Sequence, residues 1–246
     1  MLSPPDSHPL APMLRKLSLW GALADEDRHA LLELPHIVRA LGPASHVVRE
    51  GDRAEHCCLL VSGYAYRHKV VGDGGRQILA VHMAGDLIDL QNALLRTADH
   101  NIQALGPVRI AQIPREAIRE IAFGRPAVGM ALWYDTLVDG SIHREWTTNV
   151  GRRDARTRMA HFLCEFGVRL EAAGLGRICE YELPMTQEQL ADALGLTAVH
   201  VNRTLKGLDR DGFTRRAKRS VFIRDWDRLA DAGDFTSDYL HLPEAA

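Results

Sequence analysis

The 246-residue sequence contains no apolar run of membrane-spanning length, and its Pro-rich start lacks the basic-then-apolar order of a signal peptide. It has only four cysteines, Cys57, Cys58, Cys164 and Cys179, with no CxxC pair and no disulfide-framework spacing. These absences argue against a membrane protein and against a disulfide-stapled secreted protein. They predict a cytoplasmic location.

Signatures of catalysis and of metal binding are also missing. The sequence has no GxSxG, P-loop or HExxH motif, and no HxH pair of the kind with which a cupin enzyme binds its metal. We therefore expect no enzymatic activity, no catalytic residue and no metal site.

The net charge of −2 is spread unevenly along the chain. Residues 186–224 contain eight Arg or Lys and four Asp or Glu, a local balance of +4, so the remaining residues carry −6. A basic segment on an otherwise acidic chain is typical of a protein that binds an anionic polymer. A solvated surface helix is the alternative interpretation of the same charges.

Turn residues punctuate the N-terminal half of the chain. Between residues 37 and 113, short runs of β-forming residues alternate with Gly-Pro, Gly-Asp and Gly-Gly turns. This spacing predicts an antiparallel sheet folded into a jelly roll or barrel. The residues before it, up to about Met13, are expected to be loosely ordered.

A long helix is predicted over residues 126–150. Met130, Trp133, Leu137 and Ser141 form a stripe of apolar and small residues at three- and four-residue spacing along it. A helix of this length usually requires a partner, and the same helix of a second copy is the simplest one. Packing on the β-domain of its own chain is the alternative.

Two short helices follow on either side of Gly195. Thr186 and Gln189 have the spacing of a capping box at the start of the first helix, and Thr197 can cap the second. Two such helices joined by a tight glycine turn form a helix-turn-helix. The second helix, which extends to about residue 209, has three core-facing residues at i, i+4 and i+7: Val201, Leu205 and Leu208.

The other faces of this second helix carry side chains that can contact a partner outside the fold: Ala198, Val199, His200, Asn202, Arg203 and Lys206. A helix that contacts base edges in the major groove needs such a face. After it, Phe213, Val221 and Ile223 flank a basic stretch, which predicts a two-stranded wing. A helical hairpin inside an enzyme domain is the alternative interpretation.

The β-rich half, the long helix and the segment LPMTQEQLADALGLTAVHVNRTLKGLDRDG together resemble the Crp/Fnr family of bacterial transcription regulators, from about Leu17 to Asp231. The resemblance implies an α+β fold with three parts: a β-roll sensor (residues 1–125), a dimerisation helix (126–150) and a winged helix-turn-helix (151–246). It also implies a homodimer that binds two-fold symmetric DNA, with RNA polymerase as a further partner.

The resemblance assigns the base-reading residues to Val199, His200, Asn202 and Arg203. Arg203 stands where relatives bond a guanine, whereas Val199 replaces a glutamate that relatives use, so the preferred half-site should differ from theirs. Contacts with DNA phosphates add affinity without sequence specificity. We assign these contacts to Thr197, Lys206, Arg215, Arg216, Lys218 and Arg219.

Relatives that bind cyclic nucleotides carry a Gly-Glu pair for the ribose and an Arg-Ser pair for the phosphate. The equivalent positions here hold Asp89-Leu90 and Ala98-Asp99, with Arg96 and His100 nearby. Because the Asp99 carboxylate would repel a cyclic phosphate, the sequence argues against cyclic AMP. The candidate effector pocket comprises Asp89, Leu90, Arg96, Asp99 and His100.

The signal itself stays open. An iron–sulfur cluster is not expected, since no cysteine precedes Cys57. Haem remains possible through one of the histidines of the β-rich half, and Cys164 with Cys179 could form a thiol switch, although buried inert thiols are commoner. Some family members bind DNA without an effector. The alternative from another functional class is a nucleotide-binding module that controls a partner protein. Such a module would require the Arg-Ser phosphate site that this sequence lacks.

Overall fold

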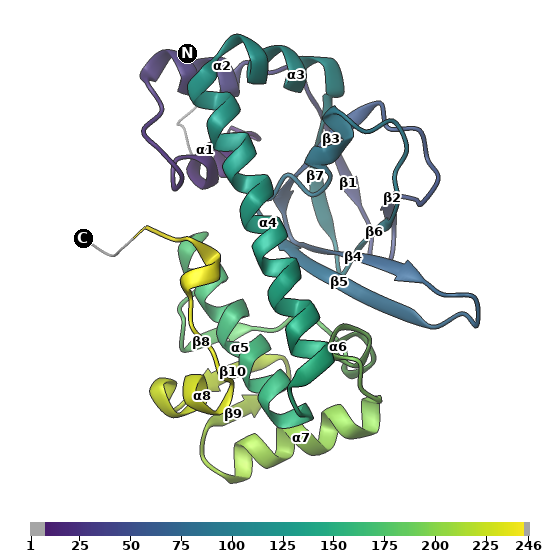
Figure 1. Cartoon of the computed structure of the whole chain (residues 1–246), viewed down its shortest axis with the longest axis vertical. Coiled ribbons are helices and arrows are strands. Elements are labelled where there is room, and N and C mark those ends of the chain that lie inside the picture. The colour runs from purple at the N-terminus through teal and green to yellow at the C-terminus, as the bar shows by residue number, and fades with distance from the viewer. Residues whose placement is uncertain (1–7, 244–246) are drawn as a thin grey trace. The chain divides into compact units, whose positions relative to one another are not determined.

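The computed structural model describes residues 8–243 of the chain (Figure 1). They divide into two compact units, of which the first holds residues up to 68, residues 81–140 and the chain end from 242. The second holds residues 69–80 and 141–241. The long helix α4 (Pro126–Arg152) contributes residues to both units. Among the described residues, no helix is long and apolar enough to cross a membrane.

Antiparallel strands make up most of the N-terminal half, as expected. One sheet has the order β1-β7-β3 and the other the order β2-β6-β4-β5, so neighbouring strands come from distant parts of the sequence. Their bounds are β1 Ile37–Leu41, β2 His46–Val48, β3 His56–Ser62, β4 Tyr64–Val70, β5 Arg76–Met83, β6 Asn101–Ala104 and β7 Val108–Pro114. The predicted β-roll is confirmed.

Short helices pack beside this roll, against β3 and β7 and one another: α1 (Ala11–Leu17), α2 (Asp25–Leu32), the 3₁₀ turn η2 (Leu90–Ala93) and α3 (Arg115–Gly124). The expectation of loose order up to Met13 is wrong for residues 8–13, while residues 1–7 lie outside the described part of the chain. Leu10 and Met13 are fully buried in the apolar core that α1 shares with α3 and the start of α4. Pro12 lies in the first turn of α1, where its missing N–H costs no hydrogen bond.

The second unit contains α5 (Ala155–Ala172), α6 (Gln187–Leu194), α7 (Ala198–Arg210) and α8 (Trp226–Ala232). Its sheet has the order β8-β10-β9, with bounds β8 Glu180–Glu182, β9 Thr214–Ala217 and β10 Ser220–Ile223. The predicted two-stranded wing therefore has a third strand. The 3₁₀ turn η3 (Asp238–Leu240) ends the unit (Figure 1).

The junction between α4 and α5 differs slightly from the expectation. The long helix is predicted to end at residue 150, but α4 continues through Gly151 to Arg152. A single exposed glycine costs a helix only about 1 kcal/mol, which the preceding helical turns can sustain. Asp154 caps α5, because its carboxylate accepts from the backbone N–H groups of Arg156 and Thr157, both at 2.9 Å.

Candidate nucleic-acid interface

The turn between α6 and α7 is built by the residues that the sequence singled out. The Thr186 hydroxyl accepts from the N–H of Gln189 at 3.2 Å, and the Gln189 side chain accepts from the N–H of Thr186 at 2.9 Å, which completes the capping box. Gly195 adopts a left-handed conformation (φ +61°), and a Cβ there would lie 3.1 Å from Val150 Cγ1. Both properties favour glycine at this turn.

Helix α7 has one buried and one exposed face. Val201, Leu205 and Leu208 are buried, which confirms the core face predicted from their spacing. Val199 has 70% of its surface exposed, and His200, Arg203 and Lys206 are also exposed. The Thr197 hydroxyl accepts from the N–H of His200 at 3.2 Å and so caps the helix. An exposed face that mixes cations, an imidazole and an apolar side chain can bind phosphates and base edges together.

Asn202 differs from the other predicted base-reading residues because it is half-buried and already has a partner. Its Nδ2 donates to Oε1 of Gln187, at the start of α6, at 3.2 Å. The sequence pattern did not identify Gln187. The contact joins the two helices of the motif and leaves the carbonyl of Asn202 available as an acceptor.

Two arginines hold the end of α7 in place. Arg156, on α5, lies 2.5 Å from the Asp211 carboxylate, and its guanidinium lies 5.0 Å from the centre of the Phe213 ring. Arg228, on α8, lies 4.8 Å from the same ring. Cations at this distance from an aromatic ring are attracted to it. Helix α7 is thus connected to α5 and α8 through Asp211 and Phe213.

The wing presents most of its basic side chains to solvent. Arg215, Lys218 and Arg219 are exposed, and Lys218 occupies the β9–β10 turn with φ +58°. Arg216 points to the opposite side of β9 from Arg215 and is half-buried, and this burial lowers the pKa of its guanidinium. Among the predicted phosphate contacts, Arg216 is therefore the least accessible.

The residues proposed for an effector pocket differ in their burial and in their partners. Asp89 is buried, and its carboxylate accepts from the Cys58 backbone N–H at 2.5 Å and from the Asn92 side chain at 3.2 Å. His100 is buried as well, with its Nδ1 at 2.6 Å from the exposed Asp99 carboxylate. Leu90 packs against the apolar core, and Arg96 is exposed.

Sequence reasoning missed a buried arginine in this unit. Arg67, in the middle of β4, is 7% exposed and lies 2.8 Å from the Asp139 carboxylate on α4. It also donates to the backbone carbonyl of Ile88 at 3.0 Å. The sequence offered little signal for this, because β4 reads YAYRHKV and Arg67 stands beside two further basic residues, His68 and Lys69.

Several of the candidate redox and haem ligands are buried. Burial raises the pKa of the Cys164 thiol to about 12, and the thiols of Cys57 and Cys58 are also held protonated by burial, with raised pKa values. Burial lowers the pKa of His82 to about 4. Among residues 8–243, no three His, Cys, Asp or Glu residues gather in a way that could hold a metal ion.

The stripe predicted on α4 is exposed over three of its four positions. Met130, Trp133 and Leu137 expose 58%, 61% and 54% of their surfaces. Ser141 is instead buried, and its hydroxyl lies 3.3 Å from Nε2 of His241. The stripe therefore ends before Ser141, where residues from the chain end cover the helix.

Comparisons with known proteins agree with this geometry. The family model of the cyclic nucleotide-binding domain matches residues 38–124, and that of the Crp-like helix-turn-helix domain matches residues 157–232, together about two thirds of the chain. The transcriptional activator protein FnrL of Cereibacter sphaeroides is 29% identical over 87% of both chains. The nitrogen fixation regulation protein FixK of Azorhizobium caulinodans is 29% identical over 83% of both.

The solved structure of FixK2 from Bradyrhizobium japonicum superimposes on the chain with a TM-score of 0.75. It is 26% identical and covers 81% of this chain and 98% of its own. The chain has a β-roll, a long helix and a helix-turn-helix in that order, and it matches both family models. It therefore belongs to the Crp/Fnr family of DNA-binding transcription regulators.

Proposed function

We propose that the protein regulates transcription as a homodimer in the cytoplasm, with the α7 helices of its two copies in the major grooves of two symmetric half-sites. The observation that carries the proposal is the outer face of α7. Val199 and Arg203 are exposed there side by side with His200, on a helix whose opposite face is fully buried. Arg203 would bond a guanine edge, and Val199 would contact a thymine methyl group.

The partner for α4 is proposed to be α4 of the second copy. Met130, Trp133 and Leu137 lie on one face and are each more than half exposed. Burying the exposed half of each side chain is worth about 1 kcal/mol, roughly half the value for a fully exposed one, and the two-fold axis doubles this gain. Phe123, at the end of α3, is 74% exposed and extends the apolar surface offered to a partner.

The dimer is tested by Leu137→Asp, with Leu94→Asp as the matched control, because Leu94 is 66% exposed but lies outside α4. Sedimentation equilibrium of the wild type and of the control should give the mass of two chains. Leu137→Asp should give one chain over most of the micromolar range, since each dimer would bury two carboxylates. A Leu137→Asp protein that stays dimeric would contradict the proposed interface.

We further propose that the signal sensed by the β-roll is not a cyclic nucleotide. The position where relatives hold the phosphate carries buried Ala98 and the carboxylate of Asp99, which is 2.6 Å from His100. Arg67 is the buried cation of this unit that could neutralise a phosphate, and it is paired with Asp139. Calorimetric titration with cyclic AMP should give no saturable heat, and a saturable signal would contradict the proposal.

The remaining assignments follow from the family. The three-part division into sensor, dimerisation helix and DNA-binding domain is proposed as the functional division of the chain. Contact with RNA polymerase is proposed because FnrL and other relatives are named transcriptional activators. In vitro transcription with a selected promoter tests this assignment, and polymerase recruitment should depend on the wild-type α7.

A further inference from the structure

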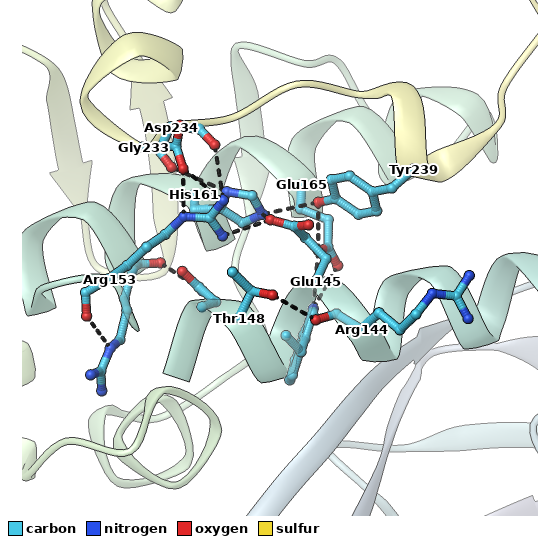
Figure 2. A network of polar contacts seen from close by, with 12 residues as sticks. Arg144, Glu145, Thr148, Arg153, His161, Glu165, Gly233, Asp234 and Tyr239 are labelled. Atoms are coloured by element: carbon cyan, nitrogen blue, oxygen red, sulfur yellow. Dashed lines mark hydrogen bonds and ion pairs between the residues drawn. The ribbon is translucent and has the colours of Figure 1, made fainter. Parts of the chain in front are cut away.

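A buried polar network joins three segments of the second unit (Figure 2). They are the end of α4, the first half of α5 and residues 233–241, which we call the C-terminal strap. His161, on α5, is 1% exposed and lies at the centre of the contacts. Its Nδ1 donates to the backbone carbonyl of Gly233 at 3.1 Å, and its Nε2 lies 3.1 Å from the hydroxyl of Tyr239. Both of these partners belong to the strap.

Glu165 connects all three segments. Its side chain is buried, and one carboxylate oxygen accepts from the Tyr239 hydroxyl of the strap at 2.8 Å. The indole N–H of Trp146, on α4, lies 3.0 Å from both carboxylate oxygens. Arg169, one turn further along α5, lies 3.2 Å from Glu165 and supplies the opposite charge. Removing one of these partners would destabilise the unit, because it would leave a buried carboxylate charge incompletely paired.

A second set of contacts ties the strap to α4 through Arg153, the residue that follows the helix. The Arg153 guanidinium lies 2.6 Å from the Glu145 carboxylate and 2.9 Å from that of Asp234. It also donates to the backbone carbonyl of Asp234 at 3.2 Å. Figure 2 shows Arg153 between Glu145 and the strap. Because this guanidinium bridges two segments, both lose a charged partner if the strap leaves.

The strap also approaches the helix backbone closely. A Cβ at Gly233 would lie 2.7 Å from the backbone nitrogen of His161, so glycine is required for this contact. At its other end, His241 reaches the buried hydroxyl of Ser141. The strap thus covers α4 and α5 over several turns, although none of its residues lies on α7 or the wing.

We propose that the C-terminal strap is a positioning element for DNA binding: it holds α5 against the end of α4 and, through α5, sets the position of α7. The link from α5 to α7 is the contact of Arg156 with Asp211 and Phe213. Docking and release of the strap give the unit two arrangements, and a change in α4 would shift the balance between them. Tyr239 and Asp234 act as positioning residues, without contact to DNA.

Charged and titratable groups surround His161. They are Glu145 on α4, Arg153 directly after that helix, Glu165 and Arg169 on α5, and Asp234 and Tyr239 on the strap. The Tyr239 hydroxyl gives its one proton to Glu165, so it can only accept from Nε2 of His161. His161 therefore joins Gly233, Tyr239 and, through Tyr239, Glu165 in one network.

Hydrogen–deuterium exchange of the full-length protein tests the proposal, together with binding to a DNA duplex that the wild type has enriched from a random-sequence pool. The variants are Tyr239→Phe, which removes one hydroxyl, and Asp234→Asn, which removes the charge at a left-handed position that asparagine tolerates (φ +47°). Thr236→Ala is the matched control, an exposed residue of the strap. Both variants should speed exchange in residues 155–166 and 233–241 and weaken DNA binding about 5- to 10-fold, and the control should do neither.

DNA affinity distinguishes positioning from a purely structural role, because a strap that only stabilises the unit would change exchange and leave binding unchanged. Faster exchange with unchanged DNA affinity in both variants would overturn the proposal, and so would unchanged exchange. The proposal rests on DNA binding through α7. If the wild type enriched no duplex, that assignment would fail, whereas unchanged exchange refutes the strap alone.

Discussion

The side-chain amide of Asn202, on α7, donates to the side-chain carbonyl of Gln187, on α6, at 3.2 Å. The residue expected to contact a base is thus oriented by the first helix of the motif. An amide held by one hydrogen bond presents its remaining acceptor in a fixed direction, which reduces the entropy lost on binding.

This contact predicts coupling between the two residues in DNA binding. Gln187→Ala and Asn202→Ala should each weaken binding to the selected duplex about 3- to 10-fold, the loss expected from one neutral hydrogen bond. The double variant should be little weaker than either single variant, because both changes remove the same interaction. Fluorescence anisotropy measures the DNA affinity of the wild type, the two single variants and the double variant. Strictly additive losses of binding free energy would show that the two residues act independently.

Arg203 and Arg219 should differ in the kind of binding that they support. Both side chains are exposed, but Arg203 lies on α7 and Arg219 on the wing. Arg203→Ala should reduce discrimination at one base pair of each half-site by about 1–3 kcal/mol. Arg219→Ala should weaken binding to selected and random duplexes alike and lower the salt slope by about 1 for each chain.

Competition titrations at several salt concentrations measure both quantities. The two variants are controls for each other, since each removes one exposed guanidinium from the same unit. Equal loss of affinity for selected and random DNA in both variants would refute this division between base-reading and phosphate-binding residues.

Asp89 and His82 should make opposing contributions to stability in acid. Burial raises the pKa of Asp89 to about 6, so its ionisation destabilises the folded state at neutral pH, and this cost disappears as the pH falls toward 4. Burial lowers the pKa of His82 to about 4, so its contribution to stability is present above about pH 6.5 and is lost over the same range. The two effects offset each other in the wild type.

Asp89→Asn removes the carboxyl group without emptying the site, because an asparagine there can still accept from the Cys58 N–H. The stability of this variant relative to the wild type should fall by about 2–3 kcal/mol between pH 7 and pH 4, mostly below pH 6. Urea unfolding of both proteins at the two pH values gives the difference, in which the other titrating groups cancel. A difference independent of pH would show that Asp89 is not perturbed as described.

Much of the second unit was predictable because its signals are local. The capping box of Thr186 and Gln189, the glycine turn at Gly195 and the apolar spacing of α7 all lie within four residues along the chain. Local hydrogen bonds and the 3.6-residue period determine such features directly. The end of α4 was less predictable, because a glycine weakens a helix without always ending it.

The partners of the polar residues could not be predicted in the same way. Arg67 and Asp139 are separated by 72 residues, and Ser141 and His241 by 100. Ser141 therefore fits a small-residue stripe in the sequence but is buried by the chain end in the structure. Residues 233–241 carry no periodic pattern that predicts their contacts, so the sequence did not identify the strap.

The sequence by itself determined the order of the elements and the buried and exposed faces of α7, because hydrophobic period, helix caps and turn residues act over a few positions. The motif of residues 183–212 also carried the resemblance to the family. Only the tertiary structure decided which charges are paired, which thiols and histidines are buried, and that the chain end covers the joint of α4 and α5. Those outcomes depend on which distant segments exclude water from the same groups, and desolvation has no signature within a single segment.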